Sequence, residues 1–220
     1  MYAAFIPFKS RNWHSRLASI LGGERQTLAL YELAHVLNVL SSYASLYVGL
    51  QVGGLSQRDL EKFLLTHYQL WSVTIIEITD VNSGIKNFYE IIPDTTETVF
   101  ICGSDLPNLQ IDDVEATLNF KEEVVFSSAP DGGTPFYRIK KSGGRLYVPQ
   151  LYVDGYTNTD VQIRRLEGLG ISYRVITDRP GLCRDLDTEQ DLKYFLSLGP
   201  DTPPIRYLRE LKPFTCQNSF

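Results

Sequence analysis

The chain has 220 residues with a formal net charge of −5 at pH 7, and 43% of its residues are hydrophobic. This length suits one sizeable α/β domain, and the acidic balance argues against broad electrostatic binding to nucleic acid or to an anionic membrane. The three cysteines, Cys102, Cys183 and Cys216, lack the spacing of a zinc site or a disulfide framework, and no apolar stretch approaches a membrane span, so we expect a cytoplasmic protein.

Strand-like and helix-like segments alternate through the first half of the chain. The helical period of leucine and valine predicts a helix over residues 24–42. Ser56 with Asp59 three residues on is typical of a helix N-cap, for a helix that runs to about residue 66. The other predicted helices are 84–92 and 111–118, and the predicted strands are 2–7, 46–52, 73–78 and 98–103.

The second half continues with shorter segments. We predict strands over 123–127, 134–139, 145–148 and 172–177, and helices over 159–168 and 188–198. Glycine-rich turns around 134–148 favour an antiparallel hairpin at the sheet edge. The fold class is therefore α/β, with a doubly wound, mostly parallel sheet and an antiparallel hairpin excursion in the second half. The stretch 199–220 is expected to wrap the body or to be mobile.

The apolar run that begins at Val99 ends in Ser104, Asp105, Leu106 and Pro107. Such a run reads as a buried strand, and Asp105 would project from its carboxyl end, where open α/β sheets bind their ligands. A carboxylate in this place suits a bound Mg²⁺. The alternative is a strand-terminating turn with a solvated aspartate.

A basic loop follows the first predicted strand. Lys9 and Arg16 in this loop are suited to neutralising a polyphosphate, and His14 between them could contact phosphate. The loop matches neither the Walker A pattern nor G-x-G-x-x-G. A solvated basic loop is the alternative.

A second aspartate-rich turn contains Asp185 and Asp187. Asp187 or Thr188 would cap the following helix, which by itself explains most of this pattern. Together with Asp105, however, Asp185 or Asp187 would complete a two-carboxylate Mg²⁺ site, because Mg²⁺ commonly uses one or two carboxylates with water and phosphate oxygens.

Two further turns offer backbone N–H groups. Asp131 opens the sequence Asp-Gly-Gly-Thr, which ends at Thr134 and suits an anionic ligand or forms a simple β-turn. Gly155 and Asn158 precede a predicted helix, whose N-terminus is either an anion site or an ordinary N-cap.

In their order along the chain, these segments resemble the 2-phospho-L-lactate guanylyltransferase family. The resemblance is carried by Lys9 with the Ser-Arg-Leu that begins at Ser15, by Asp105-Leu-Pro, by Gly-Gly-Thr134, and by the run from Asp185 to Leu192. It extends from about residue 2 to 198. It implies a nucleotide-diphospho-sugar transferase-like fold, with one nucleotidyltransferase domain over 1–198 and a C-terminal tail over 199–220.

The resemblance implies transfer of GMP from GTP to the phosphate of 2-phospho-L-lactate, phosphoenolpyruvate or 3-phosphoglycerate. Pyrophosphate is released, Mg²⁺ is the cofactor, and the product feeds assembly of the deazaflavin coenzyme F420; a homodimer is also expected. The resemblance assigns catalytic roles to Lys9, Arg16 and Asp105, nucleotide binding to Lys9, Ser15, Arg16, Asp80, Gly84 and Asn87, acceptor binding to Thr134, Gly155 and Asn158, and Mg²⁺ to Asp105, Asp185 and Asp187.

Three positions depart from the family's pattern. Pro135 stands where the family has Asn, His14 where it has Lys, and Asn158 where it has Ser. Proline lacks a carboxamide and a backbone N–H, and neutral histidine would weaken the positive charge near phosphate. Two alternatives therefore stay open: a related nucleotidyltransferase with another nucleotide or acceptor, such as a sugar phosphate, and a nucleotide-binding protein that has lost catalysis.

Overall fold

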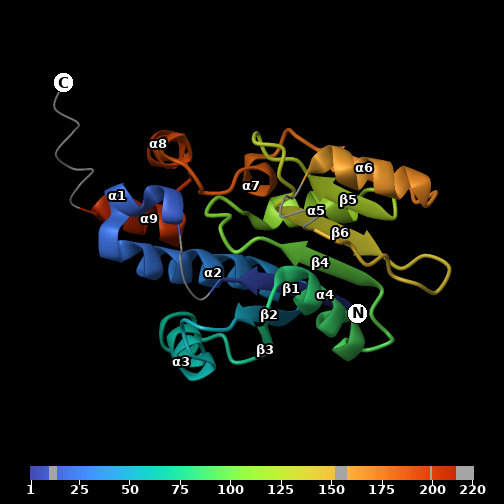
Figure 1. The fold of residues 1–220 in the computed structure, drawn as a ribbon, viewed down its shortest axis with the longest axis horizontal. Helices are drawn as coiled ribbons and strands as arrows, with labels where there is room; N and C mark the ends of the chain where they lie inside the picture. Colours follow the sequence, from blue (N-terminus) through green and yellow to red (C-terminus); the bar gives the residue numbers. More distant parts are fainter. Residues whose placement is uncertain (10–13, 152–157, 199, 212–220) are drawn as a thin grey trace.

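A computed structural model describes residues 1–9, 14–151, 158–198 and 200–211. In these residues a seven-stranded sheet has the order β3-β2-β1-β4-β6-β5-β7 (Figure 1). The strands are β1 (Tyr2–Phe8), β2 (Ser45–Gln51), β3 (Val73–Ile78), β4 (Thr98–Cys102), β5 (Val124–Ser127), β6 (Phe136–Lys140) and β7 (Tyr173–Ile176).

Strand β1 lies at the point where the chain reverses its direction across the sheet. It pairs in parallel with β2 through residues such as Phe8 opposite Leu50, and in parallel with β4 through Phe5 opposite Ile101. The chain adds β2 and β3 on one side of β1 and then returns to place β4 on the other side. In open α/β sheets such a switch point opens a crevice at the carboxyl ends of the strands, which is where ligands bind.

The antiparallel strand lies inside the sheet, so its predicted edge position is wrong. β6 pairs antiparallel with both β4 and β5. Residues Phe136 to Ile139 are all buried, because helices cover both faces of the sheet and a strand lies on each side of β6. The predicted strand 145–148 does not form. Between β6 and residue 151 the described chain makes only an isolated bridge between Ser142 and Arg145, around a turn in which Gly143 and Gly144 have positive φ.

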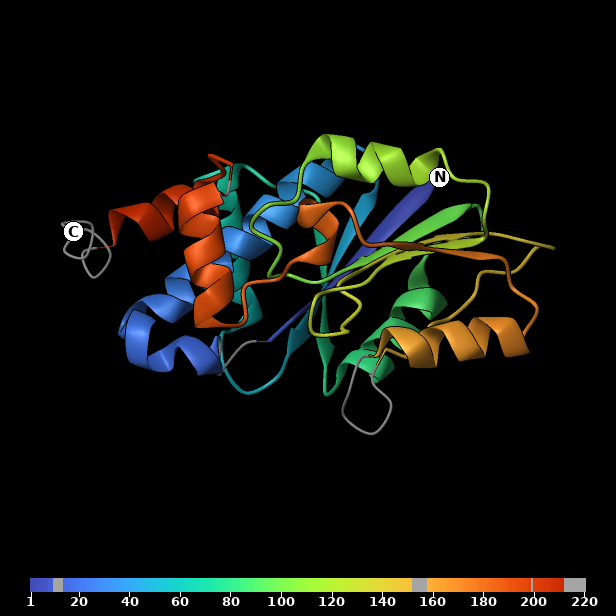
Figure 2. The same cartoon turned by 90° about the horizontal axis from the view of Figure 1, so that it is seen from above.

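Helices cover both faces of the sheet, which confirms the doubly wound fold (Figure 2). On one face pack α2 (Arg25–Ser41), α3 (Gln57–Tyr68), α5 (Ile111–Leu118) and the short α7 (Pro180–Cys183). On the other face pack α4 (Val81–Ile91) and α6 (Thr159–Gly168). The Ser56 hydroxyl caps α3 by accepting from the Asp59 N–H at 3.1 Å, as predicted. In the described part of the chain, no helix is both long and apolar enough to cross a membrane.

A third apolar cluster lies beside the sheet, at the amino-terminal end of α2. It joins the turn η1 (Ser15–Leu17) and α1 (Ala18–Leu21) to α8 (Glu189–Leu198) and α9 (Pro203–Glu210). The short turn η2 (Gly22–Glu24) connects α1 to α2 (Figure 1). The sequence pattern did not predict α9, because prolines usually interrupt helices. Its prolines occupy the first turn, where a missing N–H breaks no helical hydrogen bond. The cluster holds the segments before and after the candidate site against α2.

Candidate active site

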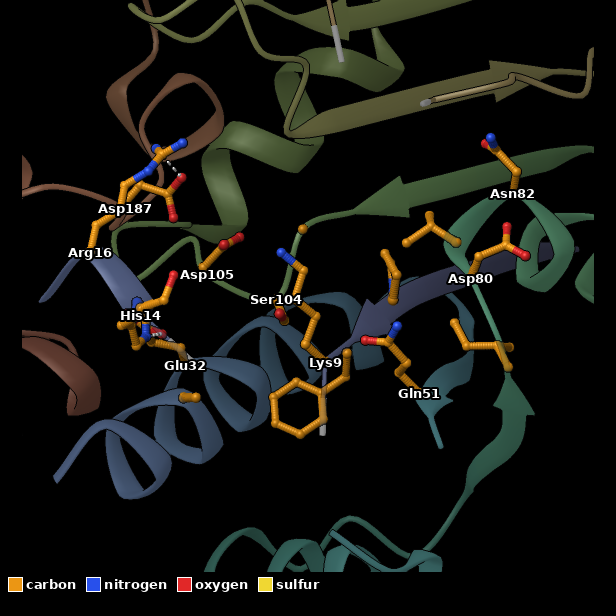
Figure 3. Close-up of a pocket in the computed structure, with 17 residues that line it drawn as sticks. Lys9, His14, Arg16, Glu32, Gln51, Asp80, Asn82, Ser104, Asp105 and Asp187 are labelled. Atoms are coloured by element: carbon orange, nitrogen blue, oxygen red, sulfur yellow. Dashed lines mark hydrogen bonds and ion pairs between the residues drawn. The ribbon is translucent and has the colours of Figure 1, made fainter. Parts of the chain in front are cut away.

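A cavity of about 480 Å³ lies at the carboxyl ends of four neighbouring parallel strands. Each strand delivers one polar side chain to it: Lys9 follows β1, Gln51 ends β2, Asp80 follows β3 and Asp105 follows β4 (Figure 3). Its volume is in the range of small-molecule sites. The crevice expected from the topology therefore exists and is lined by charged and polar groups.

Asp105 is held at this edge by the turn that follows β4. The Gly103 N–H donates to the Pro135 carbonyl at 2.7 Å, and a Cβ at Gly103 would lie 2.8 Å from Asp105 Oδ1. A side chain at this position would therefore displace the Asp105 carboxylate. Burial and then the repulsion of Asp187 raise the pKa of Asp105, against the attraction of His14 and Lys9.

The second aspartate turn lies directly against the first. The Leu186 N–H donates to the Asp105 carbonyl at 3.1 Å, which brings Asp185 and Asp187 beside Asp105. Burial and the repulsion of Asp105 and Asp187 raise the pKa of Asp185 to about 8. Carboxylates that raise one another's pKa in this way are stabilised as anions by a nearby cation.

These aspartates fit a partial Mg²⁺ ligand set. Among the described residues, no group of three or more His, Cys, Asp or Glu side chains is arranged to hold a metal ion. Mg²⁺ usually takes only one or two protein carboxylates and completes its octahedron with water and substrate phosphates. Asp105 with Asp185 or Asp187 is a donor set of that kind, suited to a cation that arrives with a phosphate ligand.

Arg16 forms an exposed ion pair at the rim of the cavity. Its guanidinium lies 3.0 Å from the Asp187 carboxylate, and the two side chains are 65% and 39% exposed. Exposed pairs contribute little to stability. The guanidinium can therefore exchange Asp187 for a ligand anion at low cost.

Both ring nitrogens of His14, which was predicted to contact phosphate, have partners within the protein. Its Nδ1 donates to the Leu186 carbonyl at 2.8 Å, and its Nε2 lies 2.8 Å from the Glu32 carboxylate. Burial alone would lower its pKa, but Glu32, Asp105 and the Leu186 carbonyl outweigh this and raise the pKa to about 9. The ring is thus charged near neutral pH, yet both of its nitrogens already have partners.

The backbone at His14 is held in an unusual conformation. His14 has φ 43° and ψ 47°, in the left-handed region, which costs an L-residue roughly 1 kcal/mol. Its side chain is only 4% exposed, and that of Glu32 only 1%. The two buried hydrogen bonds to the ring offset this strain and fix the start of η1.

The far end of the cavity is polar with apolar walls (Figure 3). Asp80 caps α4 by accepting from the Ser83 N–H at 2.9 Å, and these hydrogen bonds lower its pKa. The Gln51 Nε2 donates to the Thr79 carbonyl at 3.3 Å, which orients the amide. Ile78 and Val81 lie beside them. Apolar side chains with hydrogen-bonding groups beside them suit a heterocyclic base.

Two residues predicted to contact the nucleotide do not line the cavity. A Cβ at Gly84 would lie 2.8 Å from Ile78 Cγ2, so this glycine allows α4 to approach the sheet closely. Asn87 is exposed on α4. The other residues predicted for nucleotide binding, namely Lys9, Ser15, Arg16 and Asp80, all line the cavity.

The turns predicted to bind the acceptor lie next to one another. Thr159 Oγ1 donates to the Gly132 carbonyl at 3.1 Å, which joins the Asp131 turn to the start of α6. The negative charge of Asp131 helps to raise the pKa of Asp185, so the Asp131 turn lies near the second aspartate turn. The side chain of Asn158 caps α6. Neither it nor the buried Thr134 lines the cavity, and Gly155 lies outside the described residues.

Comparison with known proteins agrees with this geometry. The family described as "Guanylyl transferase CofC like" matches residues 2–219. The chain belongs to this family. The 2-phospho-L-lactate guanylyltransferase of Archaeoglobus fulgidus is 25% identical over 207 residues, which are 94% of this chain and 88% of that protein.

Solved structures share the fold. A candidate nucleotide-diphospho-sugar transferase from Desulfovibrio desulfuricans G20 has a TM-score of 0.76 at 17% identity, with 95% of this chain and 94% of that chain covered. A 4-diphosphocytidyl-2C-methyl-D-erythritol synthase from Anaerococcus prevotii has a TM-score of 0.59 at 12% identity, with 95% and 98% covered. The match to the guanylyltransferase family over residues 2–219 identifies the chain as a nucleotidyltransferase, and the shared fold agrees with this.

Sequence reasoning missed three polar residues that line the cavity of this CofC-like protein. Glu32 stands four residues after Leu28 and four before Val36, so the helical period places it on the buried face of α2, and this was the signal that could have found it. Gln51 lies at the end of the predicted strand 46–52, whereas Asn82 lies in the first turn of α4, before the predicted start of that helix at residue 84. Their position after parallel strands was the signal that could have found them.

Proposed function

We propose that this protein transfers GMP from GTP to the phosphate of a small phosphorylated acid, releases pyrophosphate and depends on Mg²⁺. One observation carries the proposal. Asp105 lies between the Arg16–Asp187 ion pair and Lys9 (Figure 3), at the charged end of a cavity whose other end suits a base.

The nucleotide would lie along the cavity. Lys9 and Arg16 would neutralise the triphosphate, with Arg16 exchanging its exposed bond to Asp187 for a phosphate oxygen. Asp105 with Asp185 or Asp187 would hold Mg²⁺, which when bound withdraws charge from the phosphate it contacts. Gln51 and Asp80 would lie beside guanine, whose N1–H and amino group are donors that suit their oxygen atoms.

The transfer needs no protein nucleophile. A phosphate oxygen of the acceptor attacks the α-phosphorus of GTP, the bond from that phosphorus to the bridging oxygen breaks, and pyrophosphate leaves. The chain supplies in-line positioning and positive charge from Lys9 and Arg16, which are the main sources of rate in such reactions.

The relative's name favours 2-phospho-L-lactate as the acceptor, with phosphoenolpyruvate and 3-phosphoglycerate as further candidates. The acceptor would bind between the Asp131 turn and the start of α6, which border Asp185. The product would then serve coenzyme F420 biosynthesis, carried out by a homodimer in the cytoplasm. The carbonyl of Pro135 accepts the Gly103 N–H. Because Pro135 replaces the asparagine of the family, it is the position that would adapt the site to another phosphorylated substrate.

A pyrophosphate-release assay tests this function. Purified protein with Mg²⁺ is given GTP, ATP, CTP or UTP against the three phosphorylated acids and a panel of sugar phosphates. We expect release with GTP and at least one of the acids. Release only with a sugar phosphate or another nucleotide would contradict the assignment, and GTP binding without release under any condition would identify a protein that has lost catalysis.

A further inference from the structure

A buried chain of hydrogen bonds joins three segments that are distant in the sequence. Glu32 on α2 pairs with His14 Nε2, His14 Nδ1 donates to the Leu186 carbonyl, and the Leu186 N–H donates to the Asp105 carbonyl. We call these four residues the His14 network. It connects the core helix to both aspartate turns through one imidazole ring.

The His14 network includes or borders the residues proposed to hold phosphate and Mg²⁺. His14 directly precedes Ser15 and Arg16, while Leu186 separates Asp185 from Asp187. Leu186 is fully buried, and the His14 and Glu32 side chains are nearly so. A movement of the His14 ring would therefore shift the phosphate loop and the second aspartate turn together.

The positive charge of the His14 ring interacts with carboxylates of the protein itself. Glu32 from α2 and Asp105 from the turn after β4 are the charged groups that face the ring, and Glu32 makes the direct ion pair. The Nδ1 atom must carry hydrogen, because its partner is a carbonyl oxygen. The ring thus has no free donor for a phosphate.

We propose that His14 is a positioning residue, which with Glu32 holds the Leu186 carbonyl and thereby fixes Asp185 and Asp187 relative to Asp105. The expected effect on metal binding rests on the proposed function, because the carboxylates held in place are the proposed metal ligands. Removal of residues that orient metal ligands through hydrogen bonds typically weakens metal binding by about 10–100-fold.

The variants separate position from charge. His14→Ala alone would leave the negative charge of Glu32 buried without a partner. The informative variant therefore also removes this charge, by combining His14→Ala with Glu32→Gln. Glu32→Gln alone is the conservative variant, because a neutral ring keeps its Nδ1–H on Leu186 while Nε2 accepts from the new amide. His35→Ala is the matched control: this buried α2 histidine bonds the Leu109 carbonyl through Nε2 at 2.8 Å and does not line the cavity.

The first readout is Mn²⁺ binding in the presence of GTP, measured by electron paramagnetic resonance. We expect the double variant to bind Mn²⁺ about 10–100-fold more weakly, and Glu32→Gln to change binding by less than about threefold. His35→Ala should lower the melting temperature and leave Mn²⁺ binding unchanged. Unchanged Mn²⁺ binding in the double variant, or an equal loss in His35→Ala, would overturn the proposal.

The second readout does not depend on the proposed function. The Leu186 amide is protected by its bond to Asp105, so its hydrogen exchange, followed by NMR without metal or nucleotide, reports on the turn itself. We expect faster exchange at Leu186 in the double variant than in Glu32→Gln and His35→Ala. If wild-type protein binds no Mn²⁺ with GTP, the proposed function fails, and exchange at Leu186 alone decides the role of His14. Unchanged exchange would refute it.

Discussion

The two ends of the cavity are built on different principles. At the charged end, Asp105 and Asp187 lie on two turns that the Leu186 N–H joins, and Arg16 forms an ion pair with Asp187. At the polar end, Gln51 and Asp80 extend from strands and the start of a helix, between apolar side chains.

The difference separates chemistry from recognition. Crowded carboxylates with raised pKa values and opposing cations suit a metal ion and phosphates, whose charge changes during the reaction. An oriented amide and a capping carboxylate suit a neutral ring whose donors and acceptors are fixed. Changes at the charged end should therefore reduce turnover, and changes at the polar end should alter nucleotide affinity and choice.

The largest effect is expected from Asp105→Asn. The amide keeps the volume of the side chain and removes its negative charge, so pyrophosphate release should fall by about 10³-fold. The fold should persist, because burial and Asp187 disfavour the ionised carboxylate that is lost. Steady-state kinetics and a thermal melt measure the two quantities. Activity within a few-fold of wild type would exclude Asp105 from the reaction.

The buried ion pair at the charged end should make stability depend on pH. His14 has a pKa of about 9 in the folded protein and about 6.5 when unfolded, so its stabilisation is present below pH 6.5 and is lost as the pH rises through 9. The difference is on the order of 3 kcal/mol. Urea unfolding between pH 6 and 9.5, compared with the variant that combines His14→Asn and Glu32→Gln, should show this loss only in wild type. If the free energy of unfolding depended on pH in the same way in both proteins, the stabilising role of the charged His14 would be contradicted.

Two glycines provide the same substitution with opposite results. Gly103→Ala would push on the Asp105 carboxylate, a flexible side-chain end, so activity should fall by about 10²-fold with little loss of stability. Gly84→Ala would press on Ile78 and Phe5 in the packed interface, so the free energy of unfolding should fall by about 1–3 kcal/mol while turnover of the folded protein persists. Urea melts and kcat of both variants decide between these effects, and identical behaviour would refute the distinction.

At the polar end, Gln51→Leu should have the smallest effect. Loss of the amide removes a hydrogen-bonding partner of the base, so KM for GTP should rise about tenfold while kcat changes little. Competition between GTP and ATP measures the change in preference. A drop in kcat with unchanged KM would place the base elsewhere.

The sequence predicted the residues whose positions follow from local pattern. Lys9 and Asp105 directly follow buried strands of a parallel sheet, and the ends of such strands meet at one edge. For the same reason the helix–strand order and the Ser56 cap were predictable. Asp187 could be named because its turn precedes a clear helix.

The remaining features depend on contacts that no local pattern contains. His14 and Leu186 are separated by 172 residues, and no local pattern shows that Glu32 on α2 pairs with His14. The interior position of β6 depends on pairing with both β4 and β5, whereas its turns suggested a hairpin at an edge. Helix α9 follows prolines that signal an interruption and is stabilised by packing on α2.

A crystal structure with Mn²⁺ and a non-hydrolysable GTP analogue tests the central claim most directly. Anomalous scattering locates the metal independently of the ligand. We expect one Mn²⁺ at about 2.2 Å from a carboxylate oxygen of Asp105 and from one of Asp185 or Asp187, with the guanine beside Gln51 and Asp80. A metal bound away from Asp105, or a guanine at the charged end, would contradict the account.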